Sequence, residues 1–129
     1  MKRSDGSSKL QKILIADDHP MNREMLEEML ISLGYEAIVT SNGEEALQKI
    51  EQAKPDLALI DIQMPKLDGM AFIQQIREKP HYATFPVIAL TAYAMQGDRE
   101  RMLEAGFTSY IAKPFHLDLL EAELQRLLQ

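Results

Sequence analysis

Short apolar runs alternate along this chain with segments in which apolar residues recur at the spacing of a helix. The runs predict five strands, at Lys12–Ala16, Glu36–Thr40, Leu57–Asp61, Val87–Leu90 and Ser109–Ala112. The third run is almost continuously apolar, as expected of a central strand that is covered on both faces. Strand–helix–strand crossovers between parallel strands are right-handed in about 98% of cases. The alternation therefore predicts a doubly wound α/β fold with five parallel strands and five helices.

Start and stop signals delimit the helices. The first helix has its apolar stripe at Met21, Met25, Leu26, Met29, Leu30 and Leu33, and Gly34 ends it. The segment from Ser41 to Glu44 has the pattern of a capping box, which predicts that the second helix opens there. The other helices are expected through Phe72, Ile73 and Ile76, at Gln96–Ala105 and at Leu117–Leu128.

Size and composition fit one globular domain. The chain has 129 residues, of which 46% are hydrophobic and 26% charged. Residues 1–10 lack the apolar stretch of a signal peptide, so we expect a flexible tail there and a single domain over residues 11–129. The formal charge of −6 argues against direct binding to nucleic acids or membrane surfaces, and the lack of cysteine excludes disulfides and thiolate chemistry. Apolar runs far shorter than the roughly 20 residues of a membrane span favour a cytoplasmic protein.

Polar residues that suit metal or phosphate follow four of the expected strands. They are Asp17 and Asp18, Asp61, Thr91, and Lys113. Ligands of an open parallel α/β sheet bind outside the carboxyl ends of its strands, so we expect these side chains to meet. Adjacent acidic residues directly after a buried strand repel each other and are costly unless something binds them. The alternative interpretation of the acidic pair is a helix N-cap beside a solvated aspartate.

Three carboxylates, one hydroxyl and one amine together suit a divalent ion and a phosphoryl group. A carboxylate can act as a nucleophile and form an aspartyl phosphate, and the transfer then needs positioning and charge neutralisation. The expected roles are nucleophile for Asp61, direct metal ligand for Asp18, water-mediated metal ligand for Asp17, and phosphate contacts for Thr91 and Lys113, with the small Ala92 leaving space beside the phosphate.

Four motifs, in this order, resemble those of response-regulator receiver domains of two-component signalling. They are Leu14-Ile15-Ala16-Asp17-Asp18, the segment from Leu59 to Gly69, Leu90-Thr91-Ala92, and the segment from Tyr110 to Phe115. The resemblance extends from about Lys12 to Leu128. It implies strand order 2-1-3-4-5 and phosphoryl transfer to Asp61 from the phosphohistidine of a histidine kinase or histidine-phosphotransfer protein. It also implies a Mg²⁺ site, with Mn²⁺ as a substitute, that the backbone carbonyl of Gln63 completes.

The resemblance further implies a switch. Tyr110 falls at the family's switch aromatic, whose ring turns inward as the Thr91 hydroxyl moves toward the phosphate. A cis peptide bond is implied between Lys113 and Pro114, and X–Pro bonds allow it at modest cost. The surface formed by the fourth helix, fifth strand and fifth helix would change and bind a downstream effector or a second copy of the chain. The expected protein is a phosphorylation-controlled switch that catalyses only its own phosphorylation and dephosphorylation.

Other functions compete with this one. The chain could equally be a receiver module of a hybrid histidine kinase, which the segment from Leu90 to Met95 resembles. A Mg²⁺-dependent phosphatase with an aspartyl-phosphate intermediate usually carries a second aspartate two residues after the nucleophile, where this chain has Gln63. A flavodoxin-like cofactor binder would have glycine, serine and threonine after the first strand, whereas the acidic pair here would repel an anionic cofactor.

The histidines are set aside as site residues. The three of them, His19, His81 and His116, are too scattered in the sequence to form a metal cluster. His19 follows the acidic pair directly and could tune it, but a solvated loop histidine is the favoured interpretation.

Overall fold

The computed structural model describes residues 10–64, 66–92 and 98–128. In chain order the elements are β1 (Lys12–Ala16), α1 (Pro20–Ser32), β2 (Glu36–Thr40), α2 (Gly43–Ala53), β3 (Leu57–Asp61), α3 (Gly69–Arg77), the short 3₁₀ helix η1 (Pro80–Tyr82), β4 (Val87–Thr91), α4 (Asp98–Ala105), β5 (Ser109–Ala112) and α5 (Leu117–Leu128). Most of the expected tail and the first two residues expected for the fourth helix, Gln96 and Gly97, lie outside the described residues.

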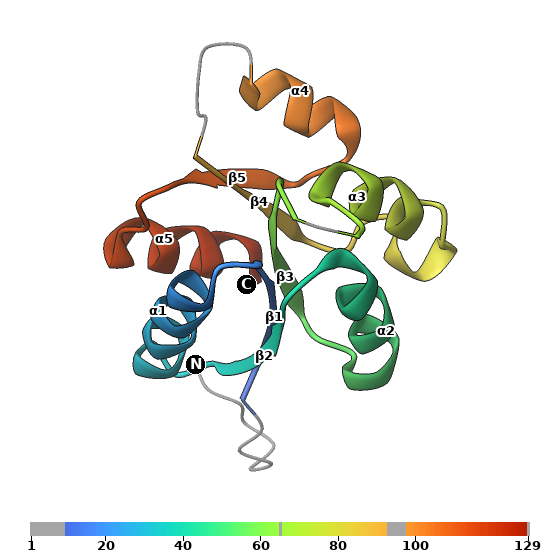
Figure 1. Cartoon of the computed structure of the whole chain (residues 1–129). Helices are drawn as coiled ribbons and strands as arrows, with labels where there is room; N and C mark the ends of the chain where they lie inside the picture. The colour runs from blue at the N-terminus through green and yellow to red at the C-terminus, as the bar shows by residue number, and fades with distance from the viewer. Residues whose placement is uncertain (1–9, 65, 93–97, 129) are drawn as a thin grey trace.

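The strands form one parallel sheet. Their order is β2-β1-β3-β4-β5, which confirms the predicted topology. Helices α1 and α5 cover one face of the sheet, and α2, α3 and α4 lie on the other side (Figure 1). The register places Asp61 beside Leu90 and Thr91 beside Ala112. The carboxyl ends of the central strands therefore lie at one edge of the sheet, where the polar residues follow them.

Alternate residues of the three central strands feed two apolar layers. The layer under α1 and α5 contains Ile13, Ile15, Leu57, Leu59, Ile88 and Leu90. The layer under α2, α3 and α4 contains Leu14, Ala16, Ala58, Ile60, Val87 and Ala89. Every residue of β3 and β4 is buried, because helices cover both faces of these strands. The strand ends that carry the site are thus held by tight packing on both sides.

Two helix details differ from the expectations. Met21 and Met25 are 77% and 40% exposed, since α1 turns Leu26 and Leu30 toward the sheet and its predicted stripe is wider than the face it buries. The capping residue of α2 is Asn42 rather than Ser41.

The cap of α2 still resembles a capping box, although its glutamate accepts from Ser41, the residue before the cap, and not from Asn42 itself. Asn42 Oδ1 accepts from the Glu45 N–H at 2.9 Å, and the Glu45 carboxylate accepts from the N–H and hydroxyl of Ser41. The bonds form one residue later than the pattern predicted, because asparagine caps a helix as well as serine does. The predicted stop of α1 is confirmed, with Gly34 at a φ of +95°.

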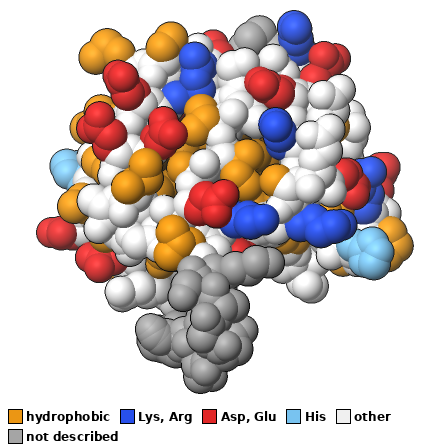
Figure 2. All heavy atoms as spheres, turned by 90° about the horizontal axis from the view of Figure 1, so that it is seen from below, with side chains coloured by type: hydrophobic (Ala, Val, Ile, Leu, Met, Phe, Trp, Pro, Cys, Tyr) orange, Lys and Arg blue, Asp and Glu red, His pale blue; other side chains and the backbone are white. Residues whose placement is uncertain are grey.

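The surface has the mixed character that the composition suggests. In the described part of the chain, no helix combines the length and apolarity that a membrane crossing requires. Acidic and basic side chains are interspersed on the face seen in Figure 2, and among the described side chains drawn there neither sign forms a continuous patch.

Candidate metal and phosphoryl site

The three acidic residues singled out in the sequence converge at the carboxyl edge of the sheet. Asp17 follows β1 and is fully buried, Asp61 ends β3 and is 3% exposed, and Asp18 is half-buried. One ligand atom from each of these residues and from His19 lies within 4.8 Å of the others. The structure therefore brings together four possible metal-ligating side chains among the described residues.

Hydrogen bonds and close backbone packing fix the main chain at this edge of the sheet. The Asp17 N–H donates to the Thr40 carbonyl at 3.3 Å, and Arg23 Nη1 donates to the Asp17 carbonyl at 2.8 Å. The loop after β3 folds back onto the strand, and the Gly69 N–H donates to the Ile62 carbonyl at 2.9 Å. A Cβ on Gly69 would lie only 2.6 Å from the Asp61 carbonyl oxygen, so a glycine is required for α3 to begin this close to the site.

Lys113 brings a positive charge to the carboxylates. Its Nζ lies 3.2 Å from Asp61 Oδ2 and 3.5 Å from Asp17 Oδ2. Its backbone N–H donates to the Thr91 carbonyl at 2.7 Å, which continues the pairing of β4 and β5 past the strand ends. The Lys113–Pro114 peptide bond is cis, as the resemblance implies.

The site carries more negative charge than this lysine can balance. Burial raises the pKa of Asp61, and the nearby charge of Asp17 raises it further, while Lys113 and the N–H of Gln63 lower it. The Gln63 N–H donates to Asp61 Oδ1 at 3.2 Å. Within the described residues, three buried carboxylate oxygens accept no hydrogen bond, namely Asp17 Oδ2, Asp18 Oδ1 and Asp61 Oδ2. Buried oxygens of this kind are costly unless a cation binds them, so the site fits a hard divalent ion.

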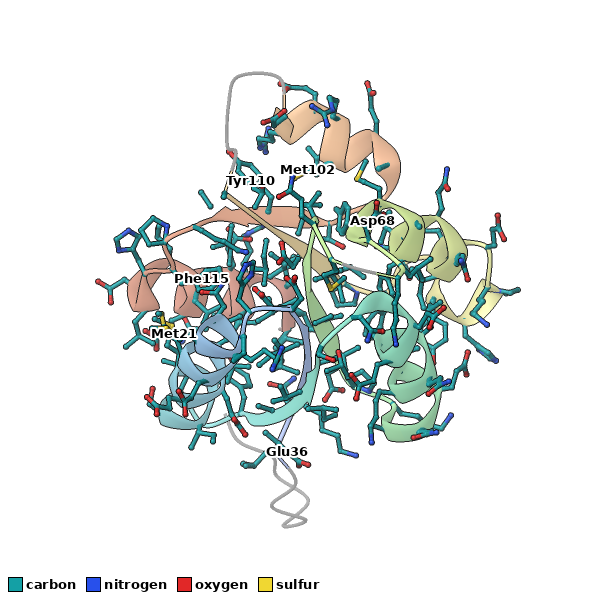
Figure 3. The ribbon with its side chains drawn as sticks, viewed as in Figure 1. Met21, Glu36, Asp68, Met102, Tyr110 and Phe115 are labelled. Atoms are coloured by element: carbon teal, nitrogen blue, oxygen red, sulfur yellow. The ribbon has the colours of Figure 1, made fainter. Side chains whose placement is uncertain are left out.

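The other predicted site residues surround the carboxylates. Thr91 is 4% exposed at the end of β4, and the neighbouring Ala92 is exposed. Tyr110 lies on β5, where it is half-buried and packs against the same apolar layer as Met102 of α4 (Figure 3). An open hollow beside the carboxylates is lined by Asp18, Ile62, Gln63, Met64, Asp68 and Met70.

His19 is an exposed histidine in the loop before α1, as expected, and its ring also lies beside the acidic cluster. Its side chain is 64% exposed, yet Nδ1 lies 3.4 Å from Asp17 Oδ1 and 3.2 Å from Asp18 Oδ1. The three histidines are scattered in the sequence, so their spacing does not indicate this contact. The sequence signal for it is the position of His19 directly after two aspartates.

Replacing Asp61 with asparagine is expected to stabilise the metal-free protein. A carboxyl group with a raised pKa binds its proton more tightly in the folded chain than in the unfolded one. Its destabilising effect is therefore present above the folded-state pKa and fades as the pH falls through that pKa toward the unfolded value near 4. Without divalent ions, chemical denaturation at neutral pH should show Asp61→Asn more stable than the parent by about 1–2 kcal/mol.

The pH dependence separates this effect from a packing change. The stability difference should shrink on acidification, whereas Asp118→Asn, at an exposed position in the first turn of α5, should differ little from the parent at any pH. A variant that is less stable than the parent at neutral pH would contradict the electrostatic account.

Comparisons with known proteins agree with this geometry. The family described as response regulator receiver domain matches residues 13–125. The chain is 38% identical over 104 residues to the polar-differentiation response regulator DivK of Brucella anthropi, covering 81% of this chain and 85% of that protein. It is 39% identical over 112 residues to the sensor histidine kinase RcsC of Escherichia coli, covering 87% of this chain but 12% of the kinase.

Solved structures show the same fold. The receiver domain of the sensor histidine kinase PA1611 from Pseudomonas aeruginosa, which has a magnesium ion coordinated in its active site cleft, superposes with a TM-score of 0.84 at 42% identity and covers 92% of this chain and 97% of that domain. The chemotaxis protein CheY4 of Vibrio cholerae superposes with a TM-score of 0.86 at 31% identity, covering 92% of this chain and 99% of that protein.

Proposed function

Because this chain belongs to the response-regulator receiver family, we propose that Asp61 accepts a phosphoryl group from a phosphohistidine, with Mg²⁺ bound beside it. The observation that carries the proposal is the state of the Asp61 carboxylate. It is buried at the end of a central strand, and its Oδ2 forms an ion pair with Lys113, whose Nζ lies 3.2 Å away. A carboxylate held in this way is a nucleophile with its charge-neutralising partner already in place.

The chain's own residues have separate parts in the proposed transfer. An oxygen of Asp61 attacks phosphorus, the bond from phosphorus to the donor's imidazole nitrogen breaks, and the imidazole leaves. Lys113 would pair with one phosphoryl oxygen and the Thr91 hydroxyl would donate to another, while Ala92 leaves room beside them. Asp18, Asp61 and the carbonyl of Gln63 would hold Mg²⁺ directly and Asp17 through water, and Mn²⁺ should substitute. The ion would supply charge neutralisation at the phosphoryl oxygens.

The partners follow from the chemistry. The donor would be a histidine kinase or a histidine-phosphotransfer protein, and we propose that residues 11–129 form a single receiver domain.

The chain spans most of its DivK relative but only a small part of RcsC. Free-standing regulator and hybrid-kinase module therefore stay alternatives, and a cytoplasmic location stays a prediction. A phosphatase role is disfavoured, because the position of the expected second aspartate is Gln63.

The proposed function can be tested with the intact chain. Incubation with Mg²⁺ and a small phosphodonor such as phosphoramidate should add one acid-stable, hydroxylamine-labile phosphoryl group, measured by intact mass. Addition of a chelator before the donor should prevent uptake. Full uptake after chelation would contradict the role of the metal, and the absence of uptake with Mg²⁺ would contradict the proposal as a whole.

The output surface is expected to lie at α4, β5 and α5. In α4 the buried residue is Met102, and Leu103 is 37% exposed, so the helix is held loosely and can shift. A phosphoryl group on Asp61 would draw the Thr91 hydroxyl inward and leave space for the Tyr110 ring. A charged hydrogen bond of roughly 1.5–3 kcal/mol is enough to bias two nearly balanced states. An effector or a second copy of the chain would then bind this surface.

Hydrogen exchange tests this placement of the output. Beryllofluoride bound at Asp61 should change exchange in α4 and β5, with a smaller change in α5. The Asp61→Asn variant under the same conditions is the control and should show no change. Changes confined to α1 and α2, which flank β2, with α4 and β5 silent, would place the output elsewhere.

A further inference from the structure

His19 stands where a helix cap is expected, yet its ring does not act as one. It is the N-cap residue of α1 and makes no side-chain capping hydrogen bond, while Pro20 fills the first turn. The ring instead lies against the two carboxylates that precede it, with Nδ1 3.2 Å from Asp18 Oδ1 and 3.4 Å from Asp17 Oδ1. The ring is thus placed by the carboxylates, with Nδ1 within hydrogen-bond distance of Asp17 Oδ1, and not by capping of the helix.

The distances from the His19 ring nitrogen to the carboxylate oxygens resemble those between neighbouring ligands of one metal ion. Zinc–nitrogen and zinc–oxygen bonds are about 2.0–2.2 Å long, so neighbouring ligands of one tetrahedral ion lie roughly 3.3–3.6 Å apart. The separations of Nδ1 from Asp17 Oδ1 and Asp18 Oδ1, 3.4 Å and 3.2 Å, are close to this range. Asp18 Oδ1 accepts no hydrogen bond, so the ring nitrogen is close to it without being aligned on it.

A second and independent observation also indicates a cation. Asp17 and Asp61 are 0% and 3% exposed, and one oxygen of each is buried without a hydrogen bond from the described residues. With the nearby Lys113 counted, three carboxylates leave a charge of about −2. The charge of the cluster therefore matches a divalent ion, and the added imidazole decides which divalent ions are preferred.

We propose that His19 is a nitrogen ligand of this site and gives it a preference for a divalent transition ion of the zinc class over Mg²⁺. Carboxylates, carbonyls and water suit Mg²⁺, whereas imidazole suits zinc, copper, iron and nickel. The inference rests on the proposed function in one respect, namely that the acidic cluster holds a divalent ion. It adds a residue and a metal class to that site.

Calorimetric titration of the full chain with Zn²⁺ and with Mg²⁺, separately and at one fixed neutral pH, tests the proposal. His19→Gln keeps a polar side chain at the cap and should weaken Zn²⁺ binding by roughly tenfold or more, with Mg²⁺ affinity almost unchanged. The matched control is His81→Gln, in η1 before β4 and so at the opposite end of the strand from Thr91, which should leave both affinities unchanged. In ¹H–¹⁵N spectra of the imidazole groups, Zn²⁺ should shift the Nδ1 resonance of His19, and Mg²⁺ should not.

The other possible outcomes of these titrations would overturn the proposal that His19 is a metal ligand. Equal Zn²⁺ losses in the two variants would show binding by surface histidines and overturn the proposal, as would Zn²⁺ affinity that His19→Gln leaves intact. In either case Mg²⁺ binding and phosphoryl uptake by the parent would still support the proposed function. A parent chain that binds neither ion would overturn both.

Discussion

Asp61→Asn should reduce phosphoryl uptake from a small phosphodonor to background. The amide has no charge and is a poor nucleophile, so the proposed oxygen–phosphorus bond cannot form. The substitution is almost isosteric, and the variant is expected to fold with increased stability because it removes a buried charge and, to a smaller extent, its repulsion with Asp17. Loss of uptake together with unchanged or higher stability would separate a chemical role from a structural one. Intact mass after incubation with phosphoramidate and Mg²⁺ is the measurement.

Asp68→Asn is the matched control for this experiment. Asp68 lines the same open hollow, and its Oδ1 caps α3 by accepting from the Ala71 N–H at 2.9 Å. Asparagine caps a helix as well as aspartate, so the fold should be kept. This variant should still take up one phosphoryl group. Uptake by Asp61→Asn to the same extent as by the control would show that Asp61 has been assigned wrongly.

Mg²⁺ affinity should fall about tenfold or more in Asp18→Asn, and much less in Asp17→Asn. Asp18 Oδ1 accepts no hydrogen bond, and the residue lines the open hollow, so it can bind an ion directly. Asp17 is already engaged, since its Oδ1 accepts from the His19 N–H at 2.9 Å and its Oδ2 lies near Lys113. A ligand that acts through water contributes less than one bound directly.

Calorimetric titration of both variants and the parent with Mg²⁺ gives the ranking. Asp118→Asn, at an exposed position on α5, serves as the control and should bind as the parent does. Equal losses in Asp17→Asn and Asp18→Asn would contradict the distinction between direct and water-mediated ligands. A parent chain that gives no heat with Mg²⁺ would remove the basis for the metal site.

The fold could be predicted from the sequence because its signals are local and strong. The five apolar runs give the strands almost to the residue, and β4 is longer than its predicted run by Thr91 alone. The convergence of Asp17, Asp61 and Lys113 follows from topology, since parallel strands bring their carboxyl ends to one edge. Strand order came from the family resemblance, because an alternating pattern by itself fits several orders.

The features that the sequence does not specify are those that depend on how a helix or side chain is oriented toward its neighbours. The exposure of Met21 depends on how α1 is rotated on the sheet, and six apolar residues on one helix leave that rotation open. The cap of α2 falls at Asn42, and because Ser41 and Asn42 are both good capping residues, the sequence pattern alone does not choose between them. The position of His19 depends on how the ring folds back over the turn after β1, which residue spacing alone does not specify.

The central claim is that a phosphoryl group forms on the Asp61 carboxylate, and chemical trapping tests it most directly. Borohydride reduces an aspartyl phosphate to homoserine, so mass spectrometry of peptides from the treated protein reports the modified position. The account predicts homoserine at position 61 after incubation with phosphodonor and Mg²⁺, and none when the donor is left out. Homoserine at position 17 or 18, or a phosphoryl group found on Thr91 or a histidine with position 61 unmodified, would contradict it.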